Sequence, residues 1–126
     1  MASAAKKFVV VADDRKNQKV LGSTWKAGVP LEVTQIAYRL VMNQIIKLGG
    51  KPTLRLCGGG KAGPVVTDNG NFVVDADFGQ IQDPEKLNAT LLNIPGVIET
   101  GLFVNMASKC YFGTNHGTVV TTERKL

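Results

Sequence analysis

The hydrophobic pattern begins with a continuous apolar run. Residues 8–12 read Phe-Val-Val-Val-Ala, without the alternation of apolar and polar positions that marks a half-buried strand. Such a run is typical of a strand buried on both faces, as in a parallel sheet covered by helices. Asp13, Asp14, Arg15 and Lys16 follow directly, and open α/β sheets bind ligands outside the carboxyl ends of their strands. We therefore expect either a binding site or a solvated strand-to-loop turn immediately after this strand.

The next part of the chain alternates between strand and helix patterns. Apolar positions recur at helical spacing from Ile36 to Leu48, and Gly49-Gly50 then ends the pattern. The predicted order is strand, helix, strand, strand, helix and strand, at residues 31–34, 36–48, 53–56, 72–78, 83–94 and 97–104. This order is the split βαβ, or ferredoxin-like, plan.

Turn and cap residues support these boundaries. Asn69-Gly70 predicts a hairpin between 65–67 and 72–74, because both turn residues tolerate positive φ. Asp83 followed by Pro84 is a typical helix start. Two short strands, at 111–112 and 118–121, are expected about a turn that contains His116.

The first apolar strand needs more cover than the rest of the chain offers. Full burial of its four large side chains, Phe8 to Val11, would contribute roughly 6–12 kcal/mol, which is comparable with the stability of a whole domain. The short segments after residue 105 look insufficient as neighbours. We expect the chain to be the back half of a two-domain protein, with a partner chain as the alternative source of cover.

Composition narrows the class of protein. The chain has 126 residues, of which 44% are hydrophobic and 20% charged, as in ordinary globular domains. No apolar run approaches the roughly 20 residues of a membrane-spanning helix, and no secretory signal is apparent. Cys57 and Cys110 stand apart, which favours a reducing, cytoplasmic setting over a disulfide scaffold or zinc site.

Neither the charge pattern nor the isolated motifs identify a function by themselves. The net charge is +5, with the basic excess in the first half, which suits nucleic acid, a phosphorylated small molecule or merely a solvated surface. The glycine-rich loop with Lys61 fails the phosphate-loop pattern. His116 lacks a second ligand nearby in sequence, and Asp75 with Asp77 is expected to form a solvated strand face rather than a cation site.

Three blocks of sequence resemble the type A ribose-5-phosphate isomerase family. They read KFVVVAD with Lys16 following, GPVVTDNGNF at residues 63–72, and IPGVIETGLF at residues 94–103. The resemblance runs from about residue 6 to residue 120, and the second and third blocks are highly specific. Departures are small: Thr34-Gln35 replaces a frequent Ile-Pro pair, and residues 58–61 lengthen a loop.

The resemblance implies an enzyme that interconverts ribose 5-phosphate and ribulose 5-phosphate through an enediolate, in the non-oxidative pentose phosphate pathway. It implies no metal or organic cofactor, no nucleic acid and no membrane, and a homo-oligomer, dimer or tetramer, of the full-length protein. One substrate contact carries over, Lys16, with Asp13 and Arg15 as supporting neighbours. The family's catalytic glutamate, in a Leu-Thr-Arg-Glu-Lys type segment, and its phosphate loop have no counterpart here. They are expected upstream of Met1, so no catalytic residue is assigned and the 126 residues alone are expected to be inactive.

The expected architecture is therefore the C-terminal part of a Rossmann-like large domain with an inserted ferredoxin-like domain. Residues 1–22 would be a remnant of the large domain, residues 23–100 the ferredoxin-like domain, and residues 101–126 the strands that return to the large domain. Two other functions stay open. One is a small ferredoxin-like regulatory module that binds a ligand; the other is an RNA-binding module, which is disfavoured because the strand at 53–56 carries no aromatic side chain for stacking.

Overall fold

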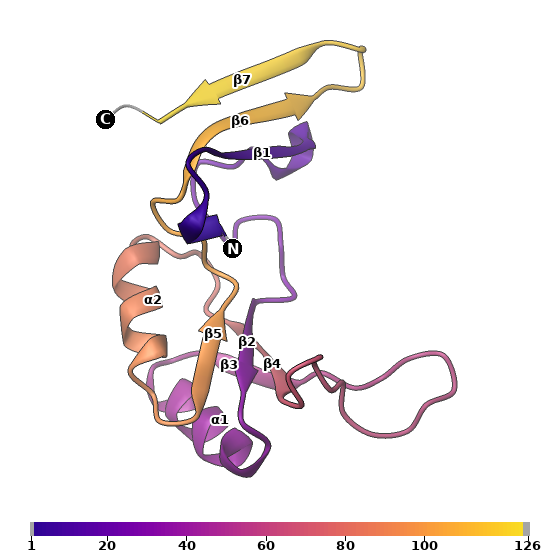
Figure 1. Ribbon diagram of the computed structural model, residues 1–126, viewed down its shortest axis with the longest axis vertical. Coiled ribbons are helices and arrows are strands. Elements are labelled where there is room, and N and C mark those ends of the chain that lie inside the picture. Colours follow the sequence, from indigo (N-terminus) through magenta and orange to yellow (C-terminus); the bar gives the residue numbers. More distant parts are fainter. Residues whose placement is uncertain (1, 125–126) are drawn as a thin grey trace. The chain divides into compact units, whose positions relative to one another are not determined.

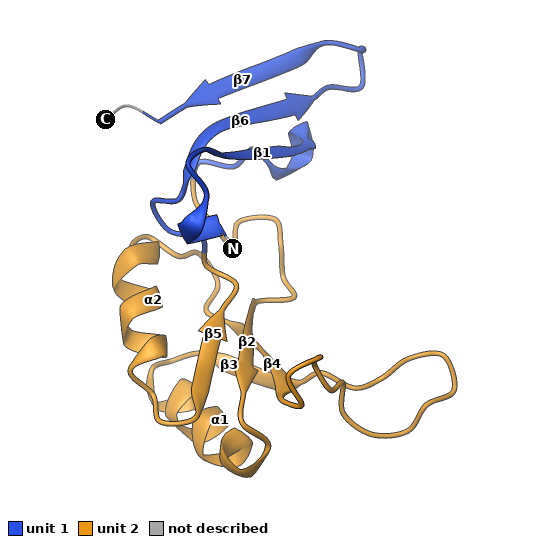
Figure 2. Ribbon diagram, viewed as in Figure 1, with its two compact units in different colours: residues 1–19, 103–126 blue, residues 20–102 orange. Residues whose placement is uncertain are grey.

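The chain consists of two compact units. A computed structural model describes residues 2–124 and divides the chain into Met1–Lys19 with Phe103–Leu126, and Val20–Leu102 (Figure 2). The two units are mixed α/β overall, with two sheets and few helices. No helix in residues 2–124 combines the length and the apolar character needed to cross a membrane.

The unit Val20–Leu102 is built on a four-stranded sheet (Figure 1). Its strand order is β3-β4-β2-β5, and each neighbouring pair is antiparallel. Two helices connect these strands, and a short 3-10 turn, η3, precedes the first of them. The bounds are β2 Val29–Val33, η3 Gln35–Ala37, α1 Tyr38–Lys47, β3 Lys51–Leu54, β4 Phe72–Asp77, α2 Pro84–Leu92 and β5 Val97–Thr100.

The core of this unit lies between one sheet face and the two helices. Along β2, Val29, Leu31 and Val33 are buried while Pro30 and Glu32 are not, so the strand has one core face. Fully buried side chains come from both layers: Leu31, Val33, Val41, Ile45, Val74 and Leu91.

The predicted helix start at Asp83 is confirmed. Its carboxylate accepts a hydrogen bond from the backbone N–H of Lys86 at 2.9 Å, and Pro84 occupies the first helical position.

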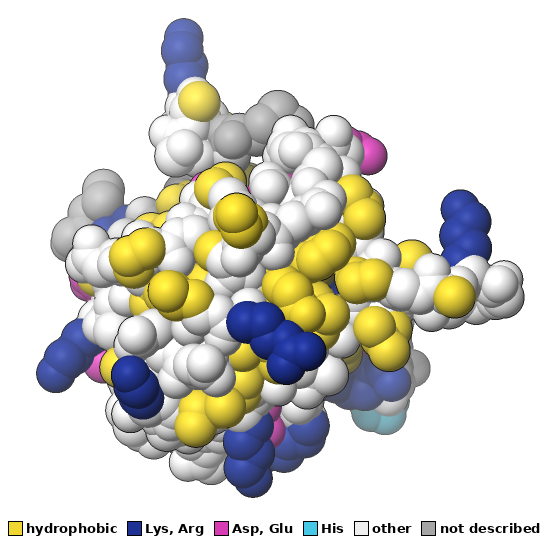
Figure 3. Space-filling model, turned by 90° about the horizontal axis from the view of Figure 1, so that it is seen from below, with side chains coloured by type: hydrophobic (Ala, Val, Ile, Leu, Met, Phe, Trp, Pro, Cys, Tyr) yellow, Lys and Arg dark blue, Asp and Glu magenta, His cyan; other side chains and the backbone are white. Residues whose placement is uncertain are grey.

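The predicted helix at 36–48 begins later, because residues 35–37 form a 3-10 turn. Ile36 is consequently 98% exposed rather than part of the apolar face, which Val41 and Ile45 provide. Apolar and basic side chains share the face seen in Figure 3.

Two predicted strands differ from the structure. Residues 65–67 do not form a full hairpin arm with β4, because this segment also pairs with the chain after β3: the Val65 N–H bonds the Arg55 carbonyl at 2.9 Å. Only an isolated bridge joins Val66 to Phe72. The strand predicted at residues 97–104 is β5, which ends at Thr100.

The other unit is a three-stranded sheet in the order β1-β6-β7, with β1 Phe8–Asp13, β6 Ala107–Gly113 and β7 Val119–Glu123. β1 and β6 are parallel, and β6 and β7 are antiparallel. A 3-10 turn, η1 Ala2–Ala4, precedes β1, and another, η2 Asp14–Lys16, follows it. The structure therefore contains the parallel strand expected at 8–12. It also contains the two strands expected on either side of the turn at 114–117, as β6 and β7.

The expectation that the rest of this chain leaves β1 without full cover is confirmed. Val9 is 37% exposed and Val11 77% exposed, whereas Phe8 packs against Phe103 with ring centroids 6.2 Å apart. In the described residues of this unit, only 3-10 turns accompany the sheet, so neither face has a helix from within the unit to cover it.

Candidate functional site

The carboxyl ends of β1 and β6 meet at one edge of the three-stranded sheet. Their parallel register pairs Asp13, the last residue of β1, with Gly113, the last residue of β6. The turn η2 and the β6–β7 turn therefore begin side by side. Lys16, the substrate contact expected from the sequence, lies in η2 at this edge.

Internal bonds fix the shape of η2. The N–H of Asn17 donates to the Asp14 carbonyl at 2.9 Å, and the Gln18 side chain donates to the Arg15 carbonyl at 3.0 Å. These bonds hold the backbone on both sides of Lys16 in a closed turn. The fold thus sets the position of the Lys16 Cα while leaving its side chain exposed.

Asp13 and Arg15 form an ion pair beside Lys16. The Arg15 Nε donates to Asp13 Oδ1 at 2.9 Å. This hydrogen bond is the main reason why the pKa of Asp13 is lowered and that of Arg15 raised. Lys16, in contrast, has no carboxylate within 4.0 Å in the described part of the chain. Lys16 is therefore the cation of η2 that is available to a ligand, while Asp13 and Arg15 occupy each other.

The structure adds a second polar turn to the same edge, which the sequence alone did not connect with Lys16. In the β6–β7 turn, Thr114 Oγ1 accepts the N–H groups of His116 at 3.3 Å and Thr118 at 3.2 Å, and lies 2.7 Å from the Thr118 hydroxyl. His116 therefore sits in a fixed turn that starts one residue after the partner of Asp13. The juxtaposition depends on the parallel pairing of strands 8–13 and 107–113, which no local sequence pattern specifies.

The chemistry offered by this edge is that of hydrogen-bond donation and positive charge. A lysine ammonium presents three donors, and it can stabilise an oxyanion or bind a sugar oxygen. Among the residues described, no group of three His, Cys, Asp or Glu side chains lies close enough to hold a metal ion. The edge suits an anionic or hydroxyl-rich ligand.

The remaining candidate motifs lie in the unit Val20–Leu102, where their polar groups bond to neighbouring residues. Asp75 forms a two-point ion pair with Arg55, whose Nε lies 2.9 Å from Asp75 Oδ2, and Asp77 accepts the N–H of Gly79 at 2.8 Å. The glycine-rich loop with Lys61 is closed by a bond from the Cys57 N–H to the Gly63 carbonyl at 2.9 Å, and no helix follows it. These aspartates and this loop serve local structure.

Comparisons with known proteins give a consistent result. The family described as Ribose 5-phosphate isomerase A (phosphoriboisomerase A) matches residues 1–117. A ribose-5-phosphate isomerase of Schizosaccharomyces pombe is 52% identical over 120 residues, which are 94% of this chain and 44% of that protein. One of Saccharomyces cerevisiae is 48% identical over 127 residues, 98% of this chain and 49% of the relative.

Solved structures are similar over the same span. Ribose 5-phosphate isomerase A of Methanocaldococcus jannaschii superposes with a TM-score of 0.85 at 40% identity, over 95% of this chain and 51% of that one. A D-ribose-5-phosphate isomerase in complex with phospho-erythronic acid has a TM-score of 0.86 at 40% identity, over 94% of this chain and 50% of that one. The chain spans about half the length of the curated relatives it matches.

Proposed function

The chain belongs to the ribose 5-phosphate isomerase A family, and we propose that the protein interconverts ribose 5-phosphate and ribulose 5-phosphate in the pentose phosphate pathway. The observation that carries this proposal is the match over residues 1–117 together with the position of Lys16, which has no carboxylate partner within residues 2–124, at the carboxyl ends of a parallel strand pair. The complex of a related isomerase with phospho-erythronic acid supports a phosphosugar as the ligand class.

In the proposed mechanism, Lys16 stabilises developing negative charge on the substrate. Moving the carbonyl between two adjacent carbons passes through an enediolate, whose oxygen carries more charge than the carbonyl of either sugar. A positioned ammonium binds that oxyanion more strongly than the neutral ground state, and this difference lowers the barrier. The closed η2 turn supports the role because it places the lysine before the substrate arrives.

Proton transfer between the two carbons needs a carboxylate base. We assign no such residue among the 126, because Asp13 is bound to Arg15 and the family's Leu-Thr-Arg-Glu-Lys type segment does not occur in this sequence. The glutamate is proposed to come from sequence that precedes Met1 in the complete enzyme. Chemistry of this kind requires neither a metal ion nor an organic cofactor.

We also propose the two-domain architecture that the sequence predicts. The unit Val20–Leu102 would be the inserted ferredoxin-like domain, which its strand order β3-β4-β2-β5 supports. The β1-β6-β7 sheet would be part of a Rossmann-like large domain, which the parallel β1–β6 pair and the exposed Val11 support. The full-length enzyme is proposed to be a cytoplasmic homo-oligomer that binds no nucleic acid.

A coupled assay of ribulose 5-phosphate formation tests the proposal. The complete enzyme should isomerise ribose 5-phosphate, and the 126-residue polypeptide alone should show no turnover above the uncatalysed rate. Absence of turnover in the complete enzyme would refute the isomerase function. Turnover of the 126-residue polypeptide close to that of the complete enzyme would refute the assignment of the base to a preceding segment.

A further inference from the structure

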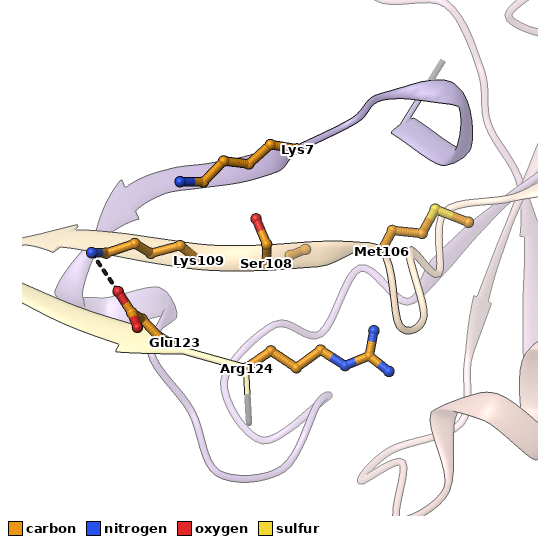
Figure 4. Close-up of a pocket in the computed structure, with 7 residues that line it drawn as sticks. Lys7, Met106, Ser108, Lys109, Glu123 and Arg124 are labelled. Atoms are coloured by element: carbon orange, nitrogen blue, oxygen red, sulfur yellow. Dashed lines mark ion pairs between the residues drawn. The ribbon is translucent and has the colours of Figure 1, made fainter. Parts of the chain in front are cut away.

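A cavity lined by charged side chains lies at the opposite end of the strands of the three-stranded sheet (Figure 4). It has a volume of about 300 Å³ and opens where β1 and β6 begin and β7 ends. Its lining residues are Lys7, Met106, Ala107, Ser108, Lys109, Glu123 and Arg124. The six residues of β1 separate this edge from Lys16 by about 20 Å.

Positive charge exceeds negative charge in this cavity. Lys109 forms an ion pair with Glu123, at 2.6 Å between Nζ and Oε1, as the dashed line in Figure 4 marks. Lys7 and Arg124 have no carboxylate within 4.0 Å among residues 2–124. One glutamate thus faces three cations, and the cavity carries an excess of two positive charges.

The surrounding bonds fix the cavity wall but leave donors unused. The Ser108 hydroxyl donates to the Phe8 carbonyl at 2.9 Å, which ties β6 to the start of β1. Arg124 donates from Nη1 to the Asn105 carbonyl. A guanidinium has five N–H donors, so most of those of Arg124 stay available while its position is held. In Figure 4 the Lys7 and Lys109 amines lie at one end of the cavity and the Arg124 guanidinium at the other.

From this arrangement we infer that the amino edge of the β1–β6 pair binds a phosphate monoester. A phosphate dianion matches the excess charge and offers acceptors to both ammonium and guanidinium groups. The cavity volume exceeds that of one phosphate group, which leaves room for the esterified carbon skeleton between Lys7 and Arg124. A nucleic acid fits less well, because its repeated phosphates need a longer basic track than one cavity.

The pKa shifts of the Lys109–Glu123 ion pair agree with this inference. The hydrogen bond to Glu123 raises the pKa of Lys109, and Lys109 followed by Lys7 lowers the pKa of Glu123. Both shifts favour the charged forms of Lys109 and Glu123, so the ion pair holds this wall of the cavity in place. The inference does not depend on the isomerase function, since Lys16 and the β6–β7 turn lie at the other edge of the sheet.

NMR titration of the purified protein with inorganic phosphate and with glycerol 3-phosphate, at low ionic strength, tests the site. Backbone amides of Ser108, Lys109 and Arg124 should shift and saturate with a dissociation constant on the order of 1 mM. Lys7→Gln and Arg124→Gln should each weaken binding about three- to tenfold. Lys6→Gln is the matched control, because Lys6 neighbours Lys7 but does not line the cavity, and should leave binding unchanged.

The two ligands distinguish the possible occupants. Tighter binding of glycerol 3-phosphate supports an ester, as inferred, whereas tighter binding of inorganic phosphate overturns the ester and leaves a site for the free anion. No saturation by about 20 mM of either ligand, or an equal effect of Lys6→Gln and Lys7→Gln, overturns the site altogether. Shifts confined to residues 14–16 and 114–118 would do the same, because they would place the ligand at the other edge.

Discussion

The Thr67 hydroxyl donates a hydrogen bond to Glu32 Oε1 at 2.7 Å and thereby ties the Asp-Asn-Gly turn to β2 of the four-stranded sheet. The side-chain amides of Asn71 and Asn69 donate to the same oxygen at 3.0 and 3.2 Å. Thr67 also accepts the N–H of Asn71 at 3.1 Å. One carboxylate oxygen therefore accepts hydrogen bonds from three side chains of the sequence block TDNGN at residues 67–71.

Replacing Glu32 with Gln should destabilise the fold by about 1–3 kcal/mol, because the neutral amide is a weaker acceptor for three donors than the carboxylate. Urea denaturation followed by circular dichroism measures the change. Asp68→Asn is the matched control: Asp68 lies in the same turn, is exposed and receives no such bonds, so its replacement should change stability by less than about 0.5 kcal/mol. Equal effects of the two variants would contradict the role of Glu32.

The same network predicts a specific loss of stability in acid. Hydrogen bonds from Thr67, then Asn71 and Asn69, lower the pKa of Glu32 below its ordinary value of 4.5. A carboxyl with a lowered folded-state pKa contributes stability above the unfolded pKa, and this contribution is lost as the pH falls through the folded pKa. Stability measured from about pH 7 to about pH 3 should therefore fall less steeply below 4.5 in Glu32→Gln than in the parent. Identical slopes would show that the carboxylate is not coupled to folding.

Gly28 should be the least replaceable of three glycines. Its φ is +88°, and an added Cβ would lie 2.5 Å from the carbonyl carbon of Ala76 on β4. Gly59 has a positive φ but open space, and Gly58 has neither constraint. We expect Gly28→Ala to cost more than about 2 kcal/mol, Gly59→Ala about 1 kcal/mol and Gly58→Ala close to nothing. Thermal unfolding of the three variants would show whether this order holds.

Asp83→Ala should destabilise the protein by about 0.5–2 kcal/mol, because it removes the acceptor for the Lys86 N–H at the start of α2. Asp83→Asn is the matched control, since an asparagine caps nearly as well. Chemical denaturation compares the two. If Asn proved as harmful as Ala, the charge of Asp83 rather than its capping bond would be responsible.

Lys16→Ala in the complete enzyme should reduce turnover of ribose 5-phosphate about 10²–10³-fold, because it removes one preorganised donor to the oxyanion. Lys19→Ala is the control, as Lys19 is an exposed lysine three residues further along the chain. Steady-state kinetics of both variants measure the effect on kcat and KM separately. A loss below threefold for Lys16→Ala would reduce this residue to a structural role.

The sequence predicted those elements whose signals are local. The Asp83 cap, the apolar strand at residues 8–12 and the strand–helix order of residues 31–104 depend on neighbours a few positions away, and the structure contains all of them. One error concerns a pairing made at a distance, because residues 65–67 also pair with the chain at Arg55 instead of forming a full hairpin arm. The others concern the bounds of elements. Ile36 matched the helical spacing, but its place in η3 exposes it, and the strand from 97 stops at Thr100.

The candidate site was predictable only in part for the same reason. Lys16 could be named because it follows a strand directly in the sequence. His116 is one hundred residues away, and its turn joins that edge through the parallel register of Asp13 with Gly113. Periodicity within a segment carries no information on such a register, and the cavity at the amino edge depends on it as well.

The place of β1 at the end of its sheet has a practical consequence for handling the protein. One row of its backbone amides and carbonyls meets no other strand within residues 2–124, and Val9 and Val11 add apolar surface beside it. An open edge of this kind is a template for strands of other molecules. Concentrated solutions of the polypeptide should aggregate by pairing of these open edges. Solubility, and not activity, would then limit the concentrations at which the polypeptide can be handled.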